Sequence, residues 1–239
     1  MDAAYTAVHI EEDRRHWYFQ GRLAVLLACL RRVLPPRRVR ILEMGCGTGN
    51  VLAALGEFGE TVGMEVSREM IAAAHAAGLD VRRGALPDDL VVPPGWADVV
   101  LLLDVIEHLD DDLAALGAAR RALASGGTLV ITVPAYRWLW SGHDIALGHR
   151  RRYTAGRLRA LVERAGFHVA HLSYFNTLLF PAILCVRAWK RWSRDPRHDL
   201  RRPARLVNRL LASAFALERF VVPRAFLPFG ASLLLVARR

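Results

Sequence analysis

Cysteine, lysine and long apolar runs are all scarce in this chain of 239 residues. Its three cysteines, Cys29, Cys46 and Cys185, lie far apart, and none has the C-x-x-C or Cys/His spacing of a zinc site. An odd number of widely separated cysteines also provides no disulfide framework. The sequence therefore predicts neither a metal site nor disulfides, and it favours a reducing, cytoplasmic compartment.

The most apolar stretch, residues 174–186, is shorter than the roughly 20 apolar residues that span a bilayer. Asn176 and Pro181 also interrupt it. Residues 1–15 are polar and lean acidic, so no signal peptide is expected. The length fits a single large domain, residues 1–239, better than two domains.

Lysine is almost absent, because 32 of the 33 basic residues are arginine and only Lys190 is lysine. Such a preference can reflect coding bias as much as function, so the formal net charge of +10 says less than where the charge lies. The positive charge is concentrated between residues 187 and 209, where nine Arg or Lys accompany two Asp, a local excess of seven (nine minus two).

Glycine is concentrated in residues 43–49, EMGCGTG, which follow an apolar run at residues 39–42. Glycines at alternate positions let the backbone turn sharply and approach a ligand closely, and a helix then begins with unpaired N–H groups. This pattern predicts a strand, a ligand-binding loop and a helix. A dinucleotide-binding loop would read GxGxxG, which is missing here because Gly49 comes one position early and Asn50 follows it.

Strands and helices are expected to alternate after this loop. Glu65 ends a second predicted strand, where an acidic side chain suits a ribose diol. Continuous apolar residues at 99–103 predict a strand buried on both faces. Further strands are expected at residues 80–83 and 128–133, the latter after a turn at residues 125–127. The alternation favours an α/β fold with a parallel sheet and helices on both faces.

These ordered motifs resemble class I S-adenosylmethionine-dependent methyltransferases, over about residues 10–174. They are the E-x-G-x-G-x-G loop, Glu65 after the next strand, the D-x-x-E-H-L segment at residues 104–109, and Gly126-Gly127. The resemblance implies a Rossmann-like sheet of seven strands, mostly parallel, with an antiparallel last strand near residues 231–236. Residues 176–228 would then be a helical insertion between strands six and seven.

The same resemblance implies S-adenosyl-L-methionine as cofactor and assigns residues to its parts. The methionine part would be held by Glu43, Gly45, Gly47 and Gly49; the ribose by Glu65, beside Val66; and the adenine by Ala85 and Leu86. The turn with Asp104, Val105 and His108 would line the methyl-transfer cleft. A helix predicted over residues 10–34 would either act as a lid, with Trp17 over the cofactor and Arg22 facing its carboxylate, or simply pack its aromatic residues in the core.

The acceptor is expected to meet residues 133–153, which follow the fifth strand and resemble the HDxxLGHxRRY segment of a bacterial subgroup with an HWWFxxR-like N-terminal helix. Methyl transfer needs a group that removes the acceptor's proton, and histidine suits this near neutral pH. His143, with Asp144 nearby, is the first candidate for the base, followed by His149 and His108. Each histidine could instead make an ordinary loop or cap hydrogen bond.

Other residues of this segment are candidates for holding the acceptor. Tyr136, Trp138 and Trp140 could wall an apolar molecule or merely pack the loop. Arg150, Arg151 and Arg152 could hold a phosphate or carboxylate, or lie in solvent; Tyr153 is also a candidate substrate contact. The segment after the fourth strand lacks the (Asp/Asn)-Pro-Pro-(Tyr/Phe) pattern associated with methylation of planar nitrogens, which makes a nucleic-acid substrate unlikely.

The insertion combines arginines and tryptophans with a predicted amphipathic helix containing Leu206, Leu210 and Phe215. Such a segment suits an anionic membrane surface at the inner face of the membrane, and nucleic acid would also accept its basic residues. Its apolar face could instead form a homodimer or pack on the sheet. The expected function is O-methylation of a small or lipid-linked acceptor. The alternatives are N- or C-methylation, and a membrane-associated protein that binds the cofactor without transferring the methyl group.

Overall fold

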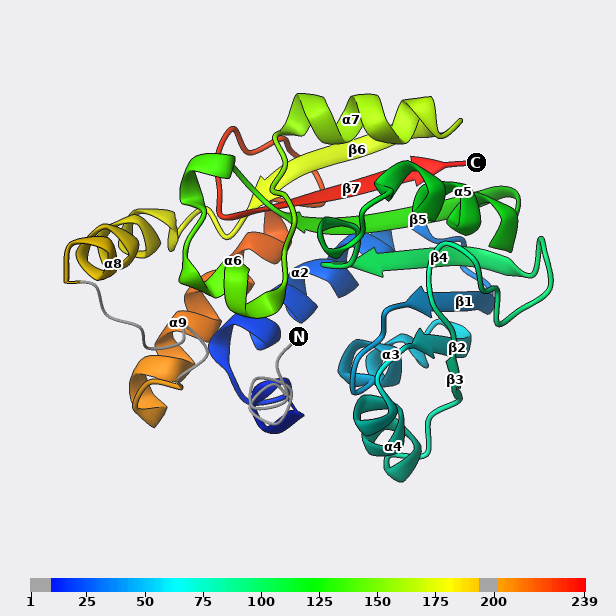
Figure 1. Ribbon diagram of the computed structural model, residues 1–239, viewed down its shortest axis with the longest axis horizontal. Coiled ribbons are helices and arrows are strands. Elements are labelled where there is room, and N and C mark those ends of the chain that lie inside the picture. Colours follow the sequence, from blue (N-terminus) through cyan, green and yellow to red (C-terminus); the bar gives the residue numbers. More distant parts are fainter. Residues whose placement is uncertain (1–9, 194–201) are drawn as a thin grey trace. The chain divides into compact units, whose positions relative to one another are not determined.

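The computed structural model describes residues 10–193 and 202–239 (Figure 1). These residues divide into two compact units. Unit 1 holds the described residues of Met1–Val33, Pro134–Thr154 and Ser173–Leu233. Unit 2 holds Leu34–Val133, Ala155–Leu172 and Leu234–Arg239. The predicted basic stretch lies partly outside the described residues, at 194–201.

Unit 2 is built on a seven-stranded sheet in the order β3-β2-β1-β4-β5-β7-β6 (Figure 1). Parallel pairing joins β1 to β2 and β4, β2 to β3, and β4 to β5, whereas β7 runs antiparallel. The predicted Rossmann-like fold is therefore confirmed. The strands are β1 (Val39–Met44), β2 (Gly59–Glu65), β3 (Val81–Arg83), β4 (Ala97–Leu103), β5 (Leu123–Pro134), β6 (His168–Phe175) and β7 (Ser232–Arg238).

The core of unit 2 follows the apolar runs of the sequence. Val99 to Leu103 of β4 are all buried, as expected for a central strand covered on both faces. Ser67 caps the helix after β2 by accepting a hydrogen bond from the Met70 N–H at 3.3 Å. The helices of this unit are α3 (Asn50–Leu55), α4 (Arg68–Ala76), the 3-10 helix η1 (Ile106–His108), α5 (Asp112–Ala122) and α7 (Ala155–Arg164).

The start of β5 differs from the prediction. Residues 125–127 were expected to form a turn before the strand, but β5 already begins at Leu123. Its pairing with β4 shifts register between Ala97 and Val99, and Gly126 has φ 72°. The glycines therefore form a bulge within the strand rather than a turn before it.

The helices of unit 1 with both ends in the described residues are α2 (Trp17–Val33), η2 (Arg137–Leu139), α6 (Gly142–Leu147), α8 (Phe180–Ser193), α9 (Arg205–Leu217) and η3 (Glu218–Phe220). The long helix predicted from residue 10 is interrupted, since residues 13–16 form turns and α2 begins at Trp17. The predicted helical insertion between the last two strands is present as α8, α9 and η3.

The helices α2 and α9 pack against each other within unit 1. Asn208 of α9 accepts the Trp17 N–H at 3.0 Å and donates to the Arg15 carbonyl at 2.9 Å, so it completes the open start of α2. Phe215 is fully buried and touches Gly21, where an added Cβ would lie 2.3 Å from its ring. The α2–α9 contact therefore depends on one glycine and one buried amide.

Glu218 joins the two ends of the insertion. Its buried carboxylate accepts three consecutive N–H groups, from Asn176 at 2.7 Å, Thr177 at 2.6 Å and Leu178 at 2.8 Å. Burial raises the pKa of Glu218 above its ordinary value of 4.5, against these three donors, which lower it.

Replacing Glu218 with alanine should lower the free energy of unfolding by roughly 3 kcal/mol, because three N–H groups each lose an acceptor worth about 1 kcal/mol. Urea unfolding followed by circular dichroism measures this. The matched control is Glu163→Ala on α7, whose carboxylate lies half-exposed 3.5 Å from Arg159 and should matter little. Equal losses in the two variants would contradict the role assigned to Glu218.

Within the described residues, no helix combines the length and the apolar character that crossing a membrane requires.

Candidate functional site

The loop after β1 has the backbone that its glycines predict. Gly47 has φ +55°, which side-chain-bearing residues rarely adopt, and an added Cβ there would meet only Met70 Sδ, at 3.8 Å. The protein therefore leaves the space over Gly47 unfilled. At Gly45, by contrast, an added Cβ would lie 2.6 Å from Val105 Cγ2. Val105 and the first glycine thus pack tightly, while the middle glycine can be approached by a ligand.

Glu65, at the end of β2, holds this loop in place. Its Oε2 accepts the Gly47 N–H at 2.9 Å, and its Oε1 accepts the N–H groups of Val66 at 2.8 Å and Ser67 at 3.0 Å. A carboxylate offers about four lone-pair sites, so three bonds leave capacity for a hydroxyl group. The carboxylate therefore links the glycine loop to the start of α4 and can still receive a polar ligand.

Glu43 and Cys46 are buried beside the same loop. Burial, together with the carboxylates of Glu43 and Glu65, raises the pKa of the Cys46 thiol far above its ordinary value. A thiol in that environment stays protonated and is a poor nucleophile. Cys46 therefore serves packing rather than covalent chemistry.

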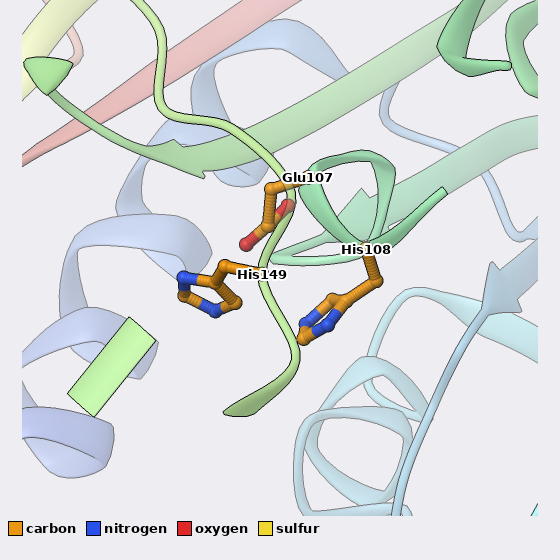
Figure 2. Close-up of side chains that lie close together, drawn as sticks. All are labelled: Glu107, His108 and His149. Carbon is orange, nitrogen blue, oxygen red and sulfur yellow. The ribbon is translucent and has the colours of Figure 1, made fainter. Parts of the chain in front are cut away.

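The turn after β4 carries further polar residues of the predicted cofactor site. Asp104 has φ 57°; its N–H donates to the Thr132 carbonyl at 2.9 Å, and its Oδ1 accepts the Thr132 hydroxyl at 3.2 Å. Glu107 and His108 follow on η1 (Figure 2). Glu107 is fully buried and His108 is half-buried. On the third predicted loop, Ala85 is exposed and donates its N–H to Asp89 at 2.9 Å, and Leu86 is half-buried.

In unit 1, Asp144 is the centre of a buried polar network. Its Oδ1 lies 2.9 Å from His149 Nδ1 and 2.7 Å from Arg152 Nε, and its Oδ2 accepts Arg152 Nη2 at 3.0 Å and the Ser141 N–H at 2.9 Å. Arg152 also donates to the Ala135 carbonyl at 2.9 Å. Burial alone would raise the pKa of Asp144, but hydrogen bonds from His149 and Arg152 and the guanidinium charge outweigh it and hold that pKa well below 3.8.

This network fixes the tautomer of His149, which lies on the loop after α6 (Figure 2). Because Asp144 is ionised, Nδ1 must carry a proton and donate it, so Nε2 of the neutral ring is the nitrogen that can accept one. Asp144 also closes the capping box of α6 through Ser141. The carboxylate therefore orients His149. His143, the first candidate from the sequence, stays a prediction.

The three arginines after His149 take different positions. Arg150 is exposed and Arg151 is half-buried, but Arg152 is buried against Asp144. Arg152 therefore belongs to the Asp144 network, whereas the sequence analysis placed it only among candidates for anion binding or solvent exposure. The only sequence signal was its distance of eight residues from Asp144, which does not identify a pair.

Tyr136 is the centre of an aromatic cluster in unit 1. Its ring stacks on Tyr174, with centroids 5.0 Å apart, and on Trp138, at 5.3 Å. Phe180 of α8 completes the cluster at 6.1 Å from Tyr136. Burial and the Tyr174 hydroxyl raise the pKa of Tyr136, so its phenol stays protonated. Trp138 is 60% exposed and offers the open side of the cluster.

Three other residues predicted to contact substrate or cofactor, Tyr153, Trp17 and Arg22, pack against neighbouring side chains or backbone. Tyr153 is fully buried and its backbone pairs with Ala135, so its side chain is part of the core. Trp17 lies edge-on to Phe215, and the Arg22 guanidinium lies 5.7 Å from the centre of the Phe19 ring. These contacts match core packing, and the role of Trp17 and Arg22 as a cofactor lid stays a prediction. Trp140 is 37% exposed.

Known proteins resemble this chain in sequence and in fold. A family model described as "Methyltransferase domain" matches residues 14–172. The Mycolicibacterium smegmatis protein "Probable S-adenosylmethionine-dependent methyltransferase" is 32% identical over 134 residues, covering 54% of this chain and 52% of that protein. A Cereibacter sphaeroides "Ubiquinone biosynthesis O-methyltransferase" is 36% identical over 103 residues, covering 41% of this chain and 42% of that protein.

The solved structure of an S-adenosylmethionine-dependent methyltransferase from Mesorhizobium loti has a TM-score of 0.59 and 21% identity, covering 90% of this chain and 98% of that one. The chain spans about half the length, or less, of the curated relatives it matches. The open space over Gly47 fits the cofactor of these relatives, and so does the Glu65 carboxylate, which can still accept a hydrogen bond from a hydroxyl group. The chain belongs to the methyltransferase domain family of S-adenosylmethionine-dependent enzymes.

Proposed function

We propose that the chain methylates a hydroxyl group of a small or lipid-linked acceptor, with His149 as the general base. The observation that carries this proposal is the contact of His149 Nδ1 with Asp144 Oδ1, at 2.9 Å. Arg152 Nε donates to the same oxygen at 2.7 Å. A histidine that an aspartate orients, and whose protonated form the aspartate stabilises, is suited to removing a proton during a reaction.

The proposed step is an in-line displacement. S-adenosylmethionine, when bound, would supply its methyl group to the acceptor oxygen, and the electron pair of the broken carbon–sulfur bond would stay on sulfur. The acceptor proton moves to His149 Nε2, and S-adenosylhomocysteine is released. Asp144 is a positioning residue, since it acts on the acceptor only through His149.

In this proposal, the acceptor contacts lie on the segment after β5. Tyr136, Trp138 and Trp140 present aromatic surface to an apolar acceptor, and Arg150 and Arg151 contact its anionic group if it has one. The Cereibacter sphaeroides relative is named for O-methylation in ubiquinone biosynthesis, which supports oxygen as the methylated atom and an acceptor with apolar character. His143 is the second candidate for the base.

The cofactor contacts in the same proposal lie at the ends of β1 and β2 and in the loops after β3 and β4. Gly45, Gly47, Gly49 and Glu43 hold the methionine part, and Glu65 with Val66 holds the ribose. Ala85 and Leu86 flank the adenine, and Asp104, Val105 and His108 line the reacting end. When bound, S-adenosylmethionine supplies an activated methyl group on sulfur, so the chain has to contribute position and a proton acceptor.

Replacing Glu65 with glutamine should weaken the binding of S-adenosylhomocysteine about tenfold or more, because an amide cannot accept all the bonds that both oxygens make. Isothermal titration calorimetry measures the affinity. The matched control is Glu60→Gln, an exposed position on the same strand, which should bind as the original chain does. Equal affinities in all three proteins would remove Glu65 from the ribose site.

The direct test of function is release of S-adenosylhomocysteine from S-adenosylmethionine in the presence of lipid and aqueous extracts, assayed separately. Turnover with mass spectrometric identification of an O-methyl product supports the proposal, and an N- or C-methyl product replaces it. Binding of the cofactor without turnover on any extract would favour the alternative, a cofactor-binding protein that does not methylate. We also propose that the insertion binds an anionic membrane surface.

A further inference from the structure

Exposed apolar side chains are concentrated in the insertion. Of the fifteen large hydrophobic side chains that are exposed among the described residues, eleven lie between residues 178 and 229. Proteins rarely leave a large contiguous apolar surface open to water without a partner for it. Five members follow one another along α9 and the residues just after it: Leu206, Leu210, Leu217, Phe220 and Val221, which we call the α9 apolar surface.

The helix α9 is apolar on two sides. Asn208 and Phe215 are buried, Phe215 in ring contact with Trp17 of α2. Leu206, Leu210 and Leu217 are 71%, 62% and 56% exposed, and their spacing of four and seven residues places them on one face of the helix. Phe220 and Val221 continue the exposed residues beyond the helix, at 57% and 43%. Packing within unit 1 therefore uses one face of α9 and leaves the other apolar face open.

Positive charge accompanies this surface. Arg205 and Arg209 are exposed on α9, and Arg219 and Arg224 are exposed after it; Arg219 lies 4.7 Å from the centre of the Phe220 ring. Glu218 is the only acidic residue between positions 202 and 230, and it is buried with its carboxylate bound to three N–H groups. Nothing acidic in this segment offsets the arginines at the surface.

We propose that the α9 apolar surface docks onto an anionic phospholipid bilayer, with α9 lying in the plane of the interface. Leucine and phenylalanine side chains enter the boundary between headgroups and acyl chains, while the arginines contact lipid phosphates. The proposal deepens the proposed function by naming the surface on which a lipid-linked acceptor would be met. It requires no methyl transfer, so it can be tested independently.

The charge pattern favours a bilayer over a second copy of this chain. A two-fold dimer through α9 would bring the same face of each copy together, and with it Arg205 and Arg209 of both copies. A bilayer with anionic headgroups instead complements both the leucines and the arginines. Nucleic acid would complement the arginines but not the exposed leucines.

The test is sedimentation of the full chain with sucrose-loaded vesicles of phosphatidylcholine, either pure or mixed with phosphatidylglycerol. We expect binding to the mixed vesicles, weakened by salt, and little binding to the pure ones. Arg205→Gln with Arg209→Gln should lower the partition coefficient about 25-fold, since each basic residue is worth about fivefold at such a surface. Leu206→Ser with Leu210→Ser should lower it at least about tenfold.

The matched control is Arg157→Gln with Arg159→Gln, two exposed arginines of α7 in unit 2, which should bind vesicles as the original chain does. Because all these positions are exposed, circular dichroism should show unchanged folding. Amide hydrogen exchange gives a second readout, in which vesicles should slow exchange at residues 205–221 and not at residues 155–164.

Three outcomes would overturn the proposal. The first is no binding to mixed vesicles at low salt. The second is a dimer in sedimentation velocity that the Leu206→Ser and Leu210→Ser changes abolish, together with absence of vesicle binding. The third is an equal loss of vesicle binding in the α7 control. If vesicles bind but no acceptor is methylated, the docking surface stands and the proposed function fails.

Discussion

Replacing His149 with glutamine should lower turnover by about 10²- to 10⁴-fold, the range that loss of a general base typically costs. Glutamine is close to histidine in size and polarity, and it can donate to Asp144, but it cannot take a proton from the acceptor. Release of S-adenosylhomocysteine with a responsive extract measures the rate. Calorimetry should show the affinity for S-adenosylhomocysteine unchanged, because the cofactor contacts proposed here lie on other residues.

The matched control is His143→Gln. His143 lies on α6, the short helix whose capping box includes Asp144. We expect this variant to keep most of its turnover, since the structure pairs Asp144 with His149. A loss confined to His143→Gln would move the base to His143. Equal rates in both variants and the original chain would show that the acceptor reacts without a histidine base.

Replacing Asp144 with asparagine should lower the free energy of unfolding at neutral pH by about 3–5 kcal/mol, because it leaves the buried Arg152 without its counter-ion. This effect depends on pH with a definite sign. The folded-state pKa of Asp144 lies well below 3.8, so its stabilising contribution is complete above that value and is lost as the pH falls through the folded-state pKa. The difference between the two proteins should therefore shrink in acid.

Urea unfolding of both proteins at neutral pH and at several pH values below 4 measures this difference. The matched control is Asp80→Asn, whose carboxylate lies 2.7 Å from Arg82 but is half-exposed, so it should cost less than about 1 kcal/mol. A difference between Asp144→Asn and the original chain that stays constant into acid would show that Asp144 is not the ionised partner of Arg152.

Much of the fold could be predicted because it follows from local patterns. In an α/β chain, the apolar run at residues 99–103 is typical of a strand covered on both faces. The glycine loop before α3 and the serine cap before α4 are also local signals, since each depends on the backbone of a few neighbouring residues. The bulge at Gly126 was missed because Ser-Gly-Gly favours a turn as strongly as a bulge.

The polar network was only partly predictable. The segment with His143, Asp144, His149 and Arg152 could be singled out by its composition, but its pairing depends on how the chain turns after α6. Gly148, with φ 72°, ends that helix and directs the following residues back, which brings His149 within 2.9 Å of Asp144. Sequence proximity favoured His143, the immediate neighbour, although adjacent residues of a helix point in different directions.

The position of β7 in the sheet has a consequence for the order of events during synthesis. β7 lies between β5 and β6, although it is the last of the seven strands along the chain. Until residues 232–238 have left the ribosome, β6 therefore has no neighbour to pair with, and the far edge of β5 stays open. This part of the sheet forms late and through contacts that are distant in sequence, which makes its assembly slow and leaves the partly made chain open to aggregation.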